Sequence, residues 1–306
     1  MLRSVFVGSP NRFTALIVHW LSNHSDLKGV VWTSSAEWGK TLSGQLLFAK
    51  KRLSRFGALK TIDEILYYLL AKNVLKPAGR LCQERLWNAY VQEYGWSEWK
   101  GNSIGTDDVN SKEVLRFVRE TSPDLIMSMC INEFFRKEIR EIPRLGAFLW
   151  HEGMVPEYKG LYSPFWAVHN REPEMLGYTV LRMNDRYDEG EVFLQGKVTG
   201  INSQVDSSVY IGHKAILDSL PEVARMFAEL ECGIASPIST EGRVSGCYTY
   251  PGLSDWIRLR IGLRGLREKA SVKDADVRST GTSQGAIQVE RSARVEARSA
   301  TESLQR

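Results

Sequence analysis

Short apolar runs alternate with a helical pattern over the first 35 residues. Residues 4–7 form an apolar run that ends in Gly8-Ser9-Pro10, and residues 27–33 form a second run. Between the runs, Asn11 precedes four apolar residues at helical spacing, Phe13, Leu16, Ile17 and Trp20. An N-cap residue before such a face predicts a helix. Strand, helix and strand in this order predict a parallel sheet with a right-handed crossover.

The alternation resumes after residue 110. Three helices are predicted, at 111–121, at 134–142 before Pro143, and at 209–230, where Pro221 should bend or divide the helix. Four further buried strands are predicted, at 125–129, 147–150, 179–183 and 191–195. The pattern therefore predicts an α/β fold that is Rossmann-like, with a mostly parallel central sheet flanked by helices.

Two segments differ from this pattern. Residues 36–105 are rich in helical periodicity and aromatic residues, and they are predicted to be a helical insertion after the second strand. The basic run Lys50-Lys51-Arg52 in this insertion has two interpretations, a site for an anionic substrate or a solvated helix face. Residues 269–306 contain no aromatic residue and one Leu, so a disordered C-terminal tail is predicted there.

Composition and charge exclude several classes of protein. The 40 basic and 36 acidic residues give a net charge of +4, which is too small to indicate nucleic-acid binding. The four cysteines, Cys82, Cys130, Cys232 and Cys247, have no zinc or redox spacing, and buried free thiols are expected. The apolar start of the chain is too short for a signal peptide, and no apolar run is long enough to span a membrane. These features predict a cytoplasmic protein.

Candidate chemistry is concentrated around one histidine. His151 directly follows the predicted strand at 147–150, so it is expected at the carboxyl edge of the sheet, where α/β folds bind ligands. The polar loop Asn184–Gly190 follows the next predicted strand and is expected to bring its carboxylates to the same edge. A histidine and a carboxylate placed together in this way form a candidate general acid–base pair.

Three motifs around His151 resemble a known family. They are Leu149-Trp150-His151 leading to Pro156-Glu157-Tyr158-Lys159-Gly160, then Pro164-Phe165-Trp166-Ala167, and then Gly177-Tyr178-Thr179 leading to Asp188-Glu189-Gly190. In this order they resemble the core of the folate-dependent formyltransferases, which include glycinamide ribonucleotide, methionyl-tRNA and sugar N-formyltransferases. The resemblance covers residues 1–35 and 106–197, and it marks residues 1–268 as a formyltransferase-like catalytic domain.

The resemblance implies transfer of a formyl group from 10-formyltetrahydrofolate, as co-substrate, to an amine. His151 would assist proton transfer and stabilise the tetrahedral intermediate, and Asp188 would orient His151. The pterin pocket would be lined by Ser128, Met129, Cys130, Asn184, Asp185 and Tyr187. The acceptor would be bound by Gly8, Ser9, Tyr158 and Lys159, and the turn at Gly8-Ser9 can hold a phosphate at a helix N-terminus. No metal is expected.

One position departs from the family pattern. The family has a catalytic Asn two residues before the His, and here that position is Leu149. Loss of an oxyanion donor costs about 2.7–4 kcal/mol in the transition state. Three alternatives stay open: Asn132 supplies a replacement donor, the enzyme works slowly with His151 alone, or formyl transfer has been lost.

The acceptor also stays open. A small metabolite or an amino sugar nucleotide is expected rather than tRNA or another nucleic acid, because the segment after Gly196 is too short for the barrel domain of the tRNA enzymes together with a tail. Hydrolysis of formyltetrahydrofolate, with water as the acceptor, is an alternative activity. A silent relative that binds folate or a partner protein is an alternative of another class, and Leu149 favours it.

Overall fold

The computed structural model describes residues 1–34, 42–131, 133–202 and 207–263. The chain divides into two compact units, Met1–Trp256 and Ile257–Arg306. In the second unit, residues 257–263 are helical. The predicted tail at 269–306, residues 36–41 of the predicted insertion, and Asn132 lie outside the described residues. The domain boundary at residue 268 stays a prediction.

The core of the first unit is a seven-stranded sheet in the order β3-β2-β1-β4-β5-β7-β8. The strands are β1 (Arg3–Gly8), β2 (Asp26–Thr33), β3 (Ser103–Thr106), β4 (Leu125–Met129), β5 (Ala147–His151), β7 (Gly177–Arg182) and β8 (Glu191–Lys197). The first five in sheet order pair in parallel, and β7 and β8 are antiparallel to their neighbours. The predicted α/β fold with a mostly parallel central sheet is therefore confirmed.

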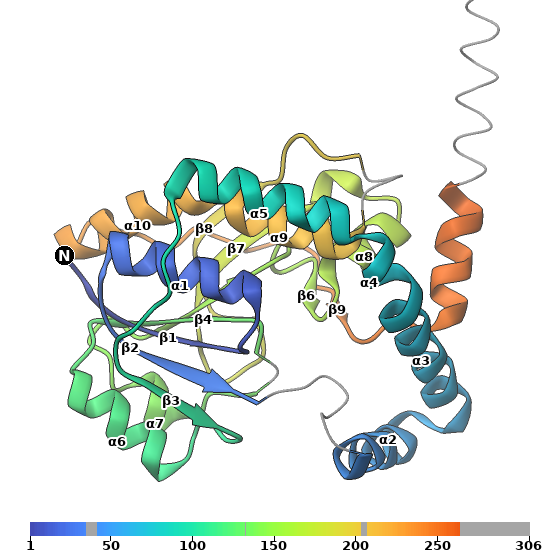
Figure 1. The fold of residues 1–306 in the computed structure, drawn as a ribbon, viewed down its shortest axis with the longest axis horizontal. Coiled ribbons are helices and arrows are strands. Elements are labelled where there is room, and N and C mark those ends of the chain that lie inside the picture. The colour runs from blue at the N-terminus through green and yellow to red at the C-terminus, as the bar shows by residue number, and fades with distance from the viewer. Residues whose placement is uncertain (35–41, 132, 203–206, 264–306) are drawn as a thin grey trace, which may run out of the picture. The chain divides into compact units, whose positions relative to one another are not determined.

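Helices cover both faces of the sheet (Figure 1). One layer holds α1 (Arg12–His24), α5 (Arg80–Tyr94), α9 (Ser208–Asp218) and α10 (Leu220–Cys232). The other face is covered by α6 (Lys112–Thr121) and α7 (Lys137–Arg140). α8 (Ser163–His169) and the 3-10 turn η2 (Pro173–Met175) connect β5 to β7, and β6 (Lys159–Gly160) pairs with β9 (Cys247–Tyr248) in a separate small sheet.

Local chemistry explains where these helices begin. The Asn11 side chain accepts hydrogen bonds from the backbone of Phe13 and Thr14, and Thr14 bonds back to Asn11 to complete a capping box at α1. Ser111 caps α6 by accepting a hydrogen bond from the backbone N–H of Val114. Pro221 occupies the first turn of α10, where it needs no backbone donor, and this explains why the predicted helix at 209–230 is divided into α9 and α10.

The predicted insertion is helical over most of its described length. It contains α2 (Leu42–Phe56), α3 (Ala58–Leu70), the π-helical turn η1 (Ala71–Leu75), α4 (Lys76–Ala78) and α5. Its end is not helical, because β3 adds an edge strand there beside β2. This strand was missed because its four residues contain a single large apolar side chain, Ile104, and pairing with β2 rather than local pattern creates it.

Two further predictions are corrected by the structure. The helix expected at 134–142 is reduced to the four residues of α7. The four cysteines, expected to be buried, are free but exposed. His213 of α9 is held inside the protein, with its ring stacked on Phe13 at 3.8 Å between centroids and its Nδ1 2.8 Å from Oε1 of Gln83.

The environment of His213 predicts a loss of stability in acid. Burial lowers the pKa of His213 from 6.5 to about 4. The unfolded chain therefore takes up a proton as the pH falls below 6.5, while the folded protein does not until the pH nears 4. The free energy of unfolding should fall across this interval by at most about 3 kcal/mol, at about 1.36 kcal/mol per pKa unit.

Urea unfolding at several pH values between 4 and 7 measures this effect, with His213→Asn as the comparison. The variant should lose less stability than the wild type over the interval from pH 6.5 to 4. Equal slopes for the two proteins would show that His213 does not couple folding to pH.

Candidate functional site

His151 is the last residue of β5, and its side chain points to the face of the sheet opposite α1 and α10. The neighbouring Trp150 indicates the direction, because its Nε1 donates to Oγ of Ser219 at 2.9 Å and its ring contacts Trp20 of α1. Alternate side chains of a strand point to opposite faces, so Leu149 and His151 share the other face. β5 runs parallel to β4, and β4 runs parallel to β1, so His151 lies at the carboxyl edge of these strands as predicted.

The hydrogen bonds of His151 define its tautomer. Its ring is 7% exposed, and Nε2 lies 2.8 Å from the carbonyl oxygen of Tyr158 and 3.1 Å from Oγ of Ser163. A carbonyl oxygen only accepts hydrogen bonds, so Nε2 carries the hydrogen. In the neutral ring, Nδ1 then holds the free lone pair, and it has no hydrogen-bond partner among the described residues. The imidazole is thus fixed through one nitrogen and is able to accept a proton at the other.

Thr179 of β7 holds the loop that follows His151. Its hydroxyl donates to the carbonyl of Gly153 at 2.7 Å and accepts from the backbone N–H of Val155 at 3.2 Å. Gln195 of β8 donates to the Val155 carbonyl at 2.8 Å and to the Thr179 hydroxyl at 2.9 Å. These bonds fold the loop back across β7 and β8.

Arg243 fixes the next part of the loop. Its guanidinium donates two hydrogen bonds to the Glu157 carboxylate, at 2.8 and 2.6 Å, and a third to Oε1 of Gln195 at 2.9 Å. A bidentate arginine–carboxylate pair restricts geometry more than a single ion pair does. This anchor could not be predicted from local pattern, because Arg243 is 86 residues from Glu157. Ser163 was also missed, although it directly precedes Pro164 of the recognised motif.

Asp188 reaches the same loop from an unexpected direction. The loop Asn184–Gly190 was expected at the carboxyl edge beside His151, and this expectation is wrong because β7 is antiparallel to β5. Met183, at the end of β7, donates instead to the carbonyl of Ala147, where β5 begins. Asp188 is brought back by accepting a hydrogen bond from the backbone N–H of Gly160 at 2.7 Å.

His151 and Asp188 therefore bind the same short segment. His151 donates to the Tyr158 carbonyl, and Asp188 accepts from Gly160, two residues further along. The two side chains make no hydrogen bond with each other among the described residues. The predicted orientation of His151 by Asp188 stays a prediction, and the contact that the structure provides for it is indirect.

Leu149, at the position of the family Asn, lies in an apolar environment. It packs against a buried cluster formed by Val155, Leu181 and Val192. Alternate residues of a strand point to the same face, so Leu149 lies on the face of β5 that also carries His151. The Leu149 side chain is apolar and supplies no hydrogen-bond donor there. The first of the three alternatives, a donor from Asn132, falls on a residue outside the described ones.

A segment of the chain matches a known family. Residues 83–214, less than half of the chain, match the family described as Formyl transferase. Over this segment, the chain is similar to the formyl transferases. It is 30% identical over 96 residues to a methionyl-tRNA formyltransferase from Thermotoga maritima, covering 31% of this chain and 30% of that protein. It is 25% identical over 128 residues to a GDP-perosamine N-formyltransferase from Brucella melitensis, covering 42% of this chain and 48% of that protein.

The chain thus spans less than half of the length of these curated relatives. A sugar N-formyltransferase structure from Shewanella aligns with 85% of this chain and 87% of its own, with 14% identity and a TM-score of 0.49. The resemblance predicted from the motifs around His151 is confirmed over residues 106–197. The match also includes residues 83–105, which the predicted resemblance left out, and it does not include residues 1–35.

The residues predicted to line a formyl transferase pterin pocket lie on two sides of the site. Ser128 and Met129 are buried at the end of β4, and the exposed Cys130 follows with a positive φ of 54°. The Ser128 hydroxyl is buried and has no hydrogen-bond partner among the residues that the structure describes, and Ser128 pairs in register with Leu149. A buried orphan hydroxyl here fits a site that is completed by a polar ligand.

The other predicted pterin residues follow β7. Asn184 donates to the Glu189 carbonyl at 3.0 Å, and Asp185 pairs with Arg140 of α7. Tyr187 is exposed and its ring lies 5.0 Å from that of Phe134. In the sheet, β5 lies between β4 and β7, so strand pairing does not bring this loop beside the end of β4. The assignment of both segments to one pocket stays a prediction.

The residues predicted to bind the acceptor already have partners in the protein. The Ser9 hydroxyl donates to the Cys130 carbonyl at 2.8 Å, which joins the ends of β1 and β4. At Gly8, a Cβ would lie 2.7 Å from the Met129 carbonyl oxygen, so the close approach of the strands requires glycine. Their role in binding a substrate stays a prediction.

Tyr158 and Lys159 are both buried and hydrogen-bonded. The Tyr158 hydroxyl donates to Glu172 at 2.5 Å, and burial together with this bond raises the pKa of that hydroxyl. Lys159 pairs with Glu189 at 2.5 Å, and this hydrogen bond lowers the pKa of the Glu189 carboxyl. Lys159 therefore links the His151 loop to the Asp188 turn a second time.

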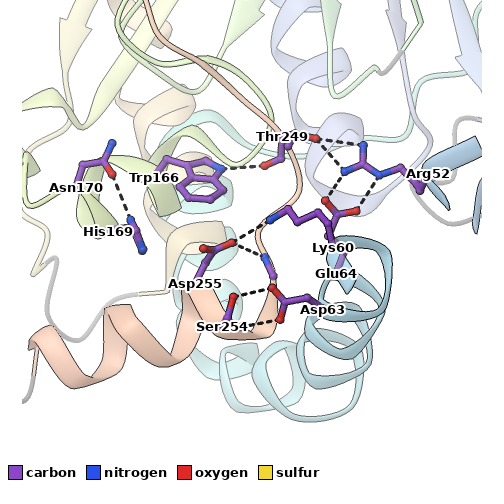
Figure 2. A network of polar contacts seen from close by, with 11 residues as sticks. Arg52, Lys60, Asp63, Glu64, Trp166, His169, Asn170, Thr249, Ser254 and Asp255 are labelled. Carbon is purple, nitrogen blue, oxygen red and sulfur yellow. Dashed lines mark hydrogen bonds and ion pairs between the residues drawn. The ribbon is translucent and has the colours of Figure 1, made fainter. Parts of the chain in front are cut away.

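The insertion is attached to the site through α8 (Figure 2). Trp166 of α8 donates to the Thr249 carbonyl at 2.9 Å, and the Thr249 hydroxyl lies 3.3 Å from two nitrogens of Arg52 on α2. Arg52 in turn forms a bidentate pair with Glu64 of α3. Since α8 begins at Ser163, which touches His151, this network ties α2 and α3 to the helix that supports the histidine.

No helix in the described part of the chain is long and apolar enough to cross a membrane. Among the residues that the structure describes, no three His, Cys, Asp or Glu side chains are grouped to hold a metal ion.

Proposed function

We propose that this protein transfers a formyl group from 10-formyltetrahydrofolate to the primary amine of a small metabolite or an amino sugar nucleotide. One observation carries the proposal: within a formyl transferase segment, His151 is fixed through Nε2 and leaves Nδ1 free to accept a proton. This is the state that a general base requires. The similarity to a GDP-perosamine N-formyltransferase supports the class of acceptor.

The proposed reaction uses His151 for the proton. The amine nitrogen attacks the formyl carbon, a carbon–nitrogen bond forms, and the carbonyl oxygen becomes an oxyanion. Nδ1 of His151 takes the proton that the amine loses, and the Tyr158 carbonyl stabilises the resulting imidazolium through Nε2–H. When the tetrahedral intermediate collapses, the bond to the folate nitrogen breaks, and His151 returns the proton to that nitrogen. Tetrahydrofolate and a formamide are the products.

A second candidate is a relative that binds folate and does not turn over. The packing of Leu149 against Val155, Leu181 and Val192 favours it, because the family Asn would donate a hydrogen bond from this position. Without a substitute donor, the rate should be lower by roughly 100- to 1,000-fold. Hydrolysis of 10-formyltetrahydrofolate is a third outcome, with water replacing the amine.

One assay separates these functions. The full chain is incubated with 10-formyltetrahydrofolate and a panel of nucleotide-linked amino sugars and small primary amines, and tetrahydrofolate, formamide and formate are measured. Tetrahydrofolate and a formamide produced together are expected. Formate released without any amine would show a hydrolase. Calorimetric binding of a folate analogue without any product would show a silent relative, and absence of both binding and product would contradict the proposal.

A further inference from the structure

The exposed face of α3 is apolar. Leu59, Ile62, Leu66 and Leu69, here called the leucine stripe, are 87%, 53%, 45% and 46% exposed. At about 100° per residue, their spacing places them within an arc of about 80° on one side of the helix. The buried residues of α3 are Thr61, Glu64 and Tyr67, two of which are polar. The helix therefore presents its most hydrophobic side to its surroundings, which is typical of an interaction surface.

α2 repeats the arrangement. Leu46, Leu53 and Phe56 are 63%, 50% and 38% exposed and recur at intervals of seven and three residues. The half-buried Ala49 lies on the same side of α2, between Leu46 and Leu53. Two successive helices thus carry an exposed apolar side of the same spacing.

The charged residues of these helices are mostly basic. From α2 to α4, residues 42–78 contain seven basic residues and two acidic ones. Both acidic side chains are used inside the protein, since Asp63 accepts two hydrogen bonds from Ser254 and Glu64 pairs with Arg52 (Figure 2). Lys60 pairs with Asp255. The exposed basic residues that make no ion pair among the described residues are Lys50, Lys51, Arg55, Lys72 and Lys76.

The combination of exposed apolar and basic side chains favours one kind of binding partner over the others. A second copy of the chain would bring the same unpaired basic residues together, and the like charges would repel. A nucleic acid would use the charges but would gain nothing from exposed leucines. The segment at 269–306 has no aromatic residue and more basic than acidic residues, so it matches neither the apolar nor the charged part of the surface. An anionic lipid surface satisfies both parts, because apolar side chains enter the acyl boundary while lysines and arginines contact the headgroups.

We propose that α2 and α3, through the leucine stripe, the exposed apolar residues of α2 and the exposed basic residues of the same segment, dock this protein onto an anionic lipid membrane. The attachment is peripheral. Because α3 is joined through Arg52, Thr249 and Trp166 to α8, docking would hold the catalytic unit itself at the membrane.

The test is co-sedimentation of the full chain with vesicles of phosphatidylcholine alone or mixed with phosphatidylserine. The wild type should bind the phosphatidylserine vesicles at least about tenfold more strongly, because each basic residue near an anionic surface contributes on the order of fivefold. Leu59→Ser with Leu66→Ser, and separately Lys50→Glu with Lys51→Glu, should each lower the partition coefficient at least about tenfold.

Matched controls use exposed residues of the same types elsewhere in the protein. Ile234→Ser with Val244→Ser removes two apolar side chains that are 70% and 81% exposed, and Lys112→Glu with Arg116→Glu reverses two exposed charges on α6. Both controls should bind as the wild type does. Circular dichroism and thermal melting verify that every variant is folded.

Three results would overturn the proposal. The first is equal binding of the wild type to both kinds of vesicle, or no binding. The second is a dimer in light scattering that the Leu59→Ser/Leu66→Ser variant dissociates, which would identify a second copy as the occupant. The third result has two parts. The charge variant loses binding to duplex RNA while the serine variant keeps it, and the serine variant also keeps its binding to vesicles. Together they would show that this surface binds its partners through charge alone.

Discussion

His151→Ala is expected to lower the rate of formyl transfer at least about 100-fold, because a positioned general base contributes roughly 100- to 10,000-fold. The substitution removes the Nδ1 lone pair and leaves the Tyr158 carbonyl bonded to the Ser163 hydroxyl at 2.9 Å. The loop should therefore keep its place while the proton acceptor is lost. Steady-state assays with an acceptor identified from the amine panel measure the effect.

Two variants separate chemistry from positioning. His151→Gln retains an N–H that can donate to the Tyr158 carbonyl but has no ring nitrogen that accepts a proton, so it should be as slow as the alanine variant. His169→Ala, on α8 with its ring stacked against Phe165, should leave the rate near that of the wild type. Activity near the wild-type level in a folded His151→Gln protein would remove proton transfer from the role of His151.

Glu64→Leu is expected to destabilise the protein by about 3–5 kcal/mol, because it leaves a buried guanidinium without its carboxylate. The Glu64 side chain is fully buried, and Arg52 is 11% exposed. Arg52 also contacts the Phe56 ring, with its guanidinium carbon 4.1 Å from the centroid, so it has little room to turn towards water. Urea unfolding measures the loss, and hydrogen exchange should show it first in α2 and α3.

The double variant Arg52→Met/Glu64→Leu provides the control for this pair. It removes both charges together, so it should recover a large part of the stability that Glu64→Leu loses. Glu141→Ala breaks the exposed pair between Lys137 of α7 and Glu141, the residue that follows this helix, and should change stability by less than about 1 kcal/mol. If Glu64→Leu were no more harmful than Glu141→Ala, the Arg52–Glu64 pair would not stabilise the insertion.

The sequence was most informative where periodicity and local chemistry agree. The Asn11 cap, the helical face from Phe13 to Trp20, and the apolar runs that became β1, β2 and β4 all follow from short-range physics. Pro221 divides its helix for the same kind of reason. β3 was missed because a four-residue edge strand carries too few apolar residues to show alternation, and its backbone is ordered by β2.

Part of the site could also be predicted from short-range pattern. His151 ends a strongly apolar strand, so its place at the carboxyl edge could be derived from sequence alone. The position of Asp188 could not, because it depends on β7 running antiparallel to β5 and on a loop that returns to present Gly160. The tautomer of His151 depends on the Tyr158 carbonyl, which reaches it only once Thr179, Gln195 and Arg243 have folded that loop.

The sequence by itself determined the α/β architecture, the resemblance to formyl transferases, and the histidine at the end of β5, because these depend on repeating apolar patterns and on motifs that are contiguous in the chain. Only the tertiary structure decided which nitrogen of His151 is free, that Leu149 is packed among apolar side chains, and that α3 turns its leucines outward. These properties depend on contacts between residues far apart in sequence and on which side of a helix packs against the rest of the protein. Local periodicity determines neither of these two features.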